Sequence, residues 1–283
     1  MTKLNATGSA LVYSTYFGST VASVAVDSAG DAYVTGFVSA SFPTTSNAYW
    51  PTNSTQSCAS GDFFLSELSP AGTQLVYSTC FNASLAGDAY SALGKIAIDG
   101  LGKAYVVGQT IEPIPMTANA YQPSQPPGLS AFAVVVDTTA SGSSSLVYST
   151  YLGGTGGNSS ASAVAVDSFG KFYLTGRTLP GFPTTPGSYQ PAHAGCAPSY
   201  GTPDSGASCL DAFVVKLDPN GSGPESLIYS TYVGGTSDEE ALAIAVDSSG
   251  SAYITGDICY LGTFPITPAS FKQRHLAGVA PLS

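Results

Sequence analysis

Hydrophobic and polar residues alternate along the chain in short segments that glycine- and proline-rich turns separate. This pattern is typical of β-strands rather than helices. The clearest example is VAVDSAGDAYVTG at residues 24–36. Its first part alternates, residues 27–30 have the composition of a tight turn, and the aromatic and β-branched residues 33–35 resume a strand. The segment therefore predicts a β-hairpin.

Three kinds of segment recur along the chain and together define one repeating unit. The hairpin of residues 24–36 returns at 96–108, 164–176 and 244–256. The segment LVYSTYFG at 11–18 returns at 75–82, 146–153 and 227–234. The segment DFFLSELSPAG at 62–72 matches 211–221 and, more loosely, 130–142. One unit therefore contains four strands, a to d: an a–b hairpin, a long connection and a c–d hairpin.

The spacing of the units predicts an all-β fold, a β-propeller of four-stranded antiparallel blades. Equivalent turn aspartates at 27, 99, 167 and 247 are 72, 68 and 80 residues apart, which exceeds the ~20–50 residues of solenoid repeats. Radially repeated four-stranded sheets form propellers, whereas a β-sandwich does not require one unit to recur. We predict a single domain over 1–283, with blade units at about 21–82, 89–153, 161–234, and 241–283 plus 1–18.

The repeat pattern begins inside a strand c and stops after a strand b. Aligning the first residues with the third unit places Lys3 opposite Lys216 and Leu4 opposite Leu217. The chain thus contains three complete units and two complementary halves. Three arrangements follow: the halves close a four-bladed ring, the chain is an excerpt of a larger propeller, or the halves pair between molecules. Head-to-tail pairing between molecules leads to a homo-oligomer or a filament.

Several of these segments resemble a known family, the bacterial seven-bladed β-propeller repeats. The matching stretches are Tyr148–Gly154, Ala165–Gly176, Phe182–Thr185, Tyr189–Pro191 and Asp211–Gly221. The resemblance covers essentially the whole chain. It implies a secreted or surface-attached bacterial protein, and it carries no family-wide catalytic motif.

Charge restricts the partners. The chain has 18 acidic and 8 basic residues, a net charge of −10, which disfavours nucleic acid and anionic membrane surfaces. No apolar run reaches the ~18 residues of a membrane span. We therefore predict a non-enzymatic, extracellular or cell-surface binding module and scaffold that self-assembles through its split blade. Its expected partners are itself, other extracellular proteins or glycans. The alternatives are a propeller enzyme acting on polysaccharide and an intracellular protein-interaction platform.

The long b–c and d–a connections share one face, which we predict to be the functional face because binding residues concentrate on loops held by a rigid scaffold. Tyr49, Tyr121 and Tyr189 recur in these loops, whereas Trp50 is the sole tryptophan and departs from the repeat. They are candidate ligand contacts, and the alternative is that each ring packs its own loop onto the blade. No cofactor is expected other than calcium, for which Asp238, Glu239 and Glu240 supply clustered oxygen atoms. The alternative for this acidic run is a solvated loop.

Five cysteines suggest disulfides rather than a zinc site, because no Cys-x-x-Cys occurs. We predict a disulfide between Cys196 and Cys209, and a second one between Cys58 and Cys80, which leaves Cys259 as the odd cysteine. His193 lies close to Cys196 in sequence, but a disulfide at Cys196 removes the nucleophile of such a pair. We therefore predict no catalytic residues.

Overall fold

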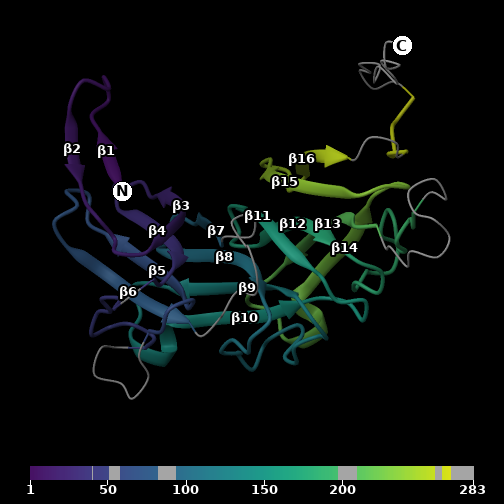
Figure 1. Ribbon diagram of the computed structural model, residues 1–283, viewed down its shortest axis with the longest axis horizontal. Coiled ribbons are helices and arrows are strands. Elements are labelled where there is room, and N and C mark those ends of the chain that lie inside the picture. Colours follow the sequence, from purple (N-terminus) through teal and green to yellow (C-terminus); the bar gives the residue numbers. More distant parts are fainter. Residues whose placement is uncertain (40, 51–57, 82–93, 197–208, 259–262, 269–283) are drawn as a thin grey trace, which may run out of the picture.

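The strands form an open arc of antiparallel sheets (Figure 1). The structure is a computed structural model that describes residues 1–283 except 40, 51–57, 82–93, 197–208, 259–262 and 269–283. Five sheets follow one another in chain order along the arc. Helical structure in the described residues consists of the 3-10 helices η2 (Gly142–Ser145) and η3 (Gly223–Ser226). Neither is long or apolar enough to cross a membrane.

Three of the sheets are complete blades with the predicted strand order a to d. Blade A contains β3 (Thr20–Val26), β4 (Ala32–Phe37), β5 (Phe63–Leu68) and β6 (Leu75–Phe81). Blade B contains β7 (Lys95–Ile98), β8 (Lys103–Thr110), β9 (Ser130–Asp137) and β10 (Leu146–Leu152). Blade C contains β11 (Ser160–Val166), β12 (Phe172–Thr178), β13 (Asp211–Leu217) and β14 (Leu227–Val233). Neighbouring strands pair in antiparallel fashion, which confirms the predicted four-stranded unit.

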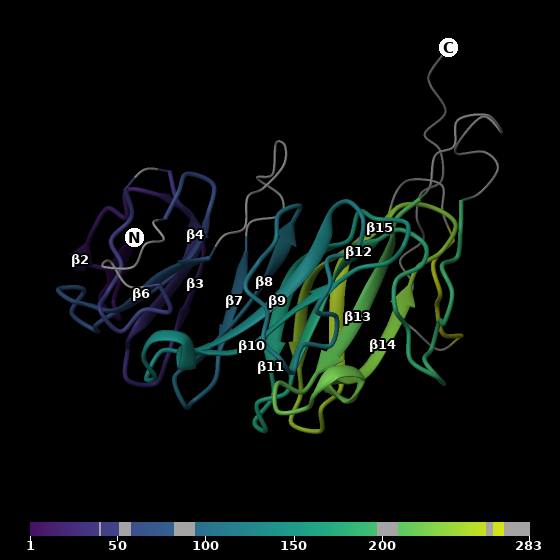
Figure 2. The same ribbon diagram turned by 90° about the horizontal axis from the view of Figure 1, so that it is seen from below.

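The other two sheets are two-stranded hairpins at opposite ends of the arc (Figures 1 and 2). The N-terminal hairpin contains β1 (Thr2–Leu4) and β2 (Leu11–Ser14), a strand c and a strand d. The C-terminal hairpin contains β15 (Glu239–Val246) and β16 (Ala252–Ile258), a strand a and a strand b. Within the described residues they do not pair with each other. The described residues therefore do not form a closed four-bladed ring.

The hydrophobic cores lie between adjacent blades. Phe63 of blade A meets Phe132 of blade B edge to face, with ring centroids 5.7 Å apart. Tyr105 of blade B lies 5.4 Å from Phe172 of blade C. Aromatic pairs of this kind contribute about 0.5–1.5 kcal/mol beyond the burial of their area. Each blade is therefore stabilised mainly by the neighbour that covers its face.

Recurring polar side chains fix the long b–c connections to strand d. In blade C, Ser230 N donates to Thr185 Oγ1 (3.1 Å), and Gly234 N donates to Gln190 Oε1 (3.0 Å). Blade B repeats the two bonds with Ser149 and Thr117 (2.9 Å) and with Gly153 and Gln122 (3.0 Å). The Pro-Thr-Thr and Tyr-Gln-Pro segments of the repeat thus have a structural role, since they hold each loop against its own blade.

In three of the four a–b hairpins, one glycine allows strand a to bulge. The register of β11 with β12 shifts between Ala161 and Ala163, and Ala161 lies opposite Gly176. A methyl group on Gly176 would lie 1.9 Å from Ser160 O. The same close approach of 1.9 Å occurs at Gly36 and Gly256. Backbone contact therefore requires glycine at Gly36, Gly176 and Gly256, whereas a methyl group on Gly108 of blade B would lie 3.0 Å from the Phe132 ring.

We predict that Gly176→Ala lowers the free energy of unfolding by about 2–3 kcal/mol, because the added methyl group displaces the backbone of strand a. Denaturant unfolding followed by circular dichroism measures this change. Gly100→Ala is the matched control, since no atom lies within 4 Å of its added methyl group. An equal loss of stability in both variants would contradict the proposed role of the glycine.

Candidate functional site

The aromatic residues predicted as ligand contacts lie in the long connections, and three of them pack against a blade. Tyr49 stacks on Phe81 with ring centroids 5.7 Å apart, and Trp50 lies 5.7 Å from Tyr49. Tyr121 packs half-buried against the core between blades B and C. Tyr189 is 69% exposed. Tyr49, Trp50 and Tyr121 therefore pack their loops onto the blades, whereas the Tyr189 ring is open to solvent. Ligand binding by these four residues stays a prediction.

The acidic run of the last d–a connection does not converge on one point. Asp238 Oδ1 accepts a hydrogen bond from Leu210 N (2.9 Å). Glu239 is buried, and its Oε2 accepts a backbone N–H of its own loop at 3.0 Å. Glu240 Oε2 pairs with Arg177 Nη1 at 3.0 Å. Among the described residues no group of three or more His, Cys, Asp or Glu side chains could hold a metal ion. Calcium binding at this run stays a prediction.

Both predicted disulfides are present. Cys58 and Cys80 join a b–c connection to strand d of blade A, and Cys196 and Cys209 close a ring within the b–c connection of blade C. In the chain-entropy model, a ring of this size stabilises the folded state by about 3 kcal/mol. Cys259 lies outside the described residues.

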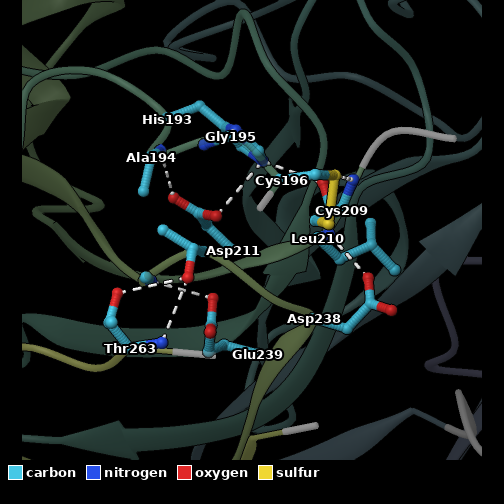
Figure 3. The surroundings of a disulfide bond; sticks show 12 residues. His193, Ala194, Gly195, Cys196, Cys209, Leu210, Asp211, Asp238, Glu239 and Thr263 are labelled. Atoms are coloured by element: carbon cyan, nitrogen blue, oxygen red, sulfur yellow. Dashed lines mark hydrogen bonds and ion pairs between the residues drawn. A yellow bond between two sulfur atoms is a disulfide. The ribbon is translucent and has the colours of Figure 1, made fainter. Parts of the chain in front are cut away.

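His193 and Asp211 form a buried polar cluster beside the disulfide of blade C (Figure 3). His193 Nε2 lies 2.9 Å from Cys209 O and 3.2 Å from Asp211 Oδ1. Gly195 N donates to His193 Nδ1 (3.0 Å), which orients the ring. Ala194 N donates to Asp211 Oδ2 (2.8 Å). The cluster thus binds the loop in front of β13 to the start of that strand.

The surroundings of the cluster suit a structural role better than catalysis. The His193 side chain is 6% exposed and that of Asp211 is 0% exposed. Cys196 is oxidised and offers no thiolate. In blade A, Asp62 stands at the same position as Asp211, and its Oδ2 accepts a hydrogen bond from Ala59 N (2.7 Å). An aspartate at the start of strand c therefore recurs as a loop anchor.

Burial dominates the electrostatics of two carboxyl groups here. It raises the pKa of Asp211, although Ala194 N–H and His193 act in the opposite direction. Burial also raises the pKa of Glu239, and the nearby charge of Asp211 raises it further. Oε1 of Glu239 has no hydrogen-bond partner. Ionising both groups therefore costs folding free energy.

A groove of about 660 Å³ lies on the face of the short a–b turns, between blades B and C. Asp99 and Leu101 from one turn and Asp167 and Phe169 from the next line it. The tips Leu101 and Phe169 are strongly exposed. This groove lies on the face of the short turns. The predicted functional face is the opposite one, which carries the long connections, and its function stays a prediction.

The two terminal hairpins expose apolar side chains whose equivalents are buried in complete blades. Leu4 of β1 is 56% exposed, whereas Leu217 at the same position of β13 is 0% exposed. Tyr253 of β16 is 62% exposed, whereas Tyr173 of β12 is 0% exposed. Leu11 of β2 is also 61% exposed. We call the exposed faces and unpaired inner edges of these hairpins the half-blade surfaces. They are the candidate functional site that the geometry supports best.

Sequence reasoning identified the two half units but not the residues that matter in them. The alignment of Lys3 with Lys216 assigns no role to either lysine. The tyrosine that recurs as Tyr105, Tyr173 and Tyr253 is, by its composition alone, a strand former. A tyrosine at one fixed position of every unit, six residues after a turn aspartate, was the available signal of a specific contact.

The blades, their meander order and the cores between them define the architecture of a β-propeller. In agreement with this, residues 147–183 match a family described as beta-propeller repeat. The match starts in β10 and contains β11 and β12, so the family's repeat runs from blade B into blade C. No curated protein sequence matches the chain significantly. The bacterial origin and the number of seven blades that the resemblance implies stay predictions.

We predict that Glu239→Gln reduces the pH dependence of stability. Because the pKa of Glu239 is raised in the folded state, its contribution is fully present below its unfolded pKa and is lost as the pH rises through the folded value. The wild type should therefore lose stability on account of this group as the pH rises from below the ordinary pKa of glutamate through the raised pKa of the folded state. Unfolding free energies measured across that range should change less in the variant. Identical pH profiles would contradict the prediction.

Proposed function

We propose that this protein is a non-enzymatic, extracellular structural and binding module of the β-propeller type, and that its half-blade surfaces pair between copies. The observation that carries the proposal is the exposure of Leu4 and Tyr253, whose equivalents in blade C are fully buried. The N-terminal hairpin supplies strands c and d, and the C-terminal hairpin supplies strands a and b. One of each makes a blade.

The free energy available from this pairing is substantial. Burying an exposed leucine side chain contributes about 1.5–3 kcal/mol, and Leu4 and Leu11 both lie on the N-terminal hairpin. The inner edges of β1 and β16 also carry backbone groups that pair with a neighbouring strand in each complete blade. Such edges are templates for strand addition. Leucine burial and backbone pairing therefore both favour the joining of the N-terminal hairpin of one copy to the C-terminal hairpin of another.

The two disulfides support an extracellular location, since disulfides persist in oxidising compartments and are rare in the cytosol. The absence of enzymatic activity is supported by the cluster around His193, which is closed to solvent and whose neighbouring cysteine is oxidised. A binding role is supported by the exposed ring of Tyr189 on a long connection. Extracellular proteins and glycans are the ligands that we propose.

Light scattering or analytical ultracentrifugation should show species of two or more copies, with masses that are multiples of 28.6 kDa. Leu4→Asp should abolish assembly and leave the fold intact, because it places a charge on the half-blade surface at an exposed position. Leu101→Asp is the matched control, since Leu101 is exposed on the short-turn face. A wild-type monomer at every concentration, or equal effects of the two variants, would contradict assembly through the half-blades.

The oxidation state has a direct test. Of five cysteines, four form disulfides, so thiol titration of the unfolded, unreduced protein should detect at most one thiol per chain. The same titration after reduction should detect five. Five thiols before reduction, in protein exported to an oxidising compartment, would argue against the extracellular assignment.

A further inference from the structure

In blades B and C, a tyrosine on strand b connects its blade to the a–b turn of the next unit. The Tyr105 hydroxyl lies 3.0 Å from Asp99 Oδ2 in its own turn and 3.2 Å from Gly170 O in the turn of blade C. The Tyr173 hydroxyl repeats this arrangement, at 3.2 Å from Asp167 Oδ2 and 3.1 Å from Gly250 O in the C-terminal hairpin. The tyrosine is therefore a recurring link between neighbouring units.

Blade C adds a lysine from strand c to this link. Lys216 Nζ lies 4.6 Å from the ring centroid of Tyr173 and 3.5 Å from Asp167 Oδ2. A methyl group on Gly250 of the next turn would lie 3.6 Å from the same Nζ. We call this group of Asp167, Tyr173 and Lys216 the Asp–Tyr–Lys contact. It combines an ion pair with a cation–π interaction, the second worth about 0.5–2 kcal/mol.

The two terminal hairpins carry complementary parts of the same contact. In the C-terminal hairpin the Tyr253 hydroxyl donates to Asp247 Oδ2 (3.0 Å), and the Tyr253 ring is largely exposed. The N-terminal hairpin holds Lys3, which matches Lys216 and donates to Pro70 O (2.9 Å). A methyl group on Gly30 would lie 3.7 Å from Lys3 Nζ. Lys3 therefore already has the position relative to the following turn that Lys216 has.

We infer that a second copy of this chain places its Lys3 over Tyr253 and beside Asp247, so that β1 of one copy pairs with β16 of the other. The inference rests on the proposed assembly of the half-blades and names the contact that specifies it. In blade C, Tyr173 pairs with Lys216 and Phe172 pairs with Leu217. The same register sets Tyr253 opposite Lys3 and Ala252 opposite Leu4, and it directs the Tyr253 hydroxyl to Gly30 O of the second copy.

Charge distinguishes this hairpin from the other c–d hairpins of the chain. The position opposite the strand-b tyrosine is Glu67 in blade A and Val135 in blade B. Opposite Tyr253, a glutamate would face the negative charge of Asp247, and a valine would leave that charge without a cation. A lysine occupies this position in blade C, where Lys216 already contacts Asp167 and Tyr173. The N-terminal hairpin has the other lysine, Lys3. A second copy therefore presents the hairpin that complements Asp247.

A charge exchange tests the inference on the full chain. Lys3→Glu and Asp247→Lys should each weaken self-assembly by about tenfold or more, because like charges then meet at every junction. A 1:1 mixture of the two variants should restore assembly, since every junction in alternating order joins opposite charges. Sedimentation measures both results, and circular dichroism verifies that each variant is folded.

The control and a second variant separate this contact from assembly in general. Lys103→Glu changes the net charge equally but lies in blade B, so mixing it with Asp247→Lys should not restore assembly. Tyr253→Phe should weaken assembly about fivefold through the loss of one hydrogen bond, whereas Tyr189→Phe should not. A monomeric wild type overturns the proposed function and this inference together. Wild-type assembly that the Lys3 and Asp247 variants leave unchanged, or that their mixture does not restore, overturns this inference alone.

Discussion

A four-stranded antiparallel sheet with two apolar faces is not stable in water by itself, and in this protein each sheet obtains its cover from the next one. The cores between blades A and B and between blades B and C contain aromatic residues from both partners. The same requirement explains the ends of the arc. Where a hairpin lacks its complementary half, residues that are buried elsewhere are open to solvent.

Polar side chains determine how the covered blades are connected. Charged residues make up 9% of the chain, and the fastening of loops depends instead on threonine, serine and glutamine. Thr185 and Gln190 illustrate this, since each accepts a backbone N–H of strand d or of the residue after it. Buried tyrosines do the same between blades: Tyr77 bonds Ser145 (2.8 Å). Neutral groups lose less hydration energy than ions on burial, so they suit a stack of closely packed sheets.

The repeat made the strands and their order predictable, because alternation and turn composition are local properties of the sequence. The Cys196–Cys209 disulfide followed from two cysteines in one b–c connection, and the Cys58–Cys80 disulfide from a cysteine before strand c and one in strand d of the same unit. The direction of side chains in irregular loops was not predictable. Asp238, Glu239 and Glu240 are adjacent in sequence but point to three different partners. The exposure of Leu4 and Tyr253 also escaped prediction, since it depends on what covers a strand rather than on the strand itself.

The division of the repeat has a consequence for the size of an assembly. Each copy contributes three complete blades and two half-blades. In the proposed assembly, every junction joins two half-blades into one blade, so each copy in a closed ring accounts for four blades. Two copies joined at both ends contain eight blades, the upper end of the common range of about four to eight for closed propellers. A third copy would bring the number to twelve. In the proposed assembly, a closed ring of more than two copies would therefore exceed the common range of blade numbers.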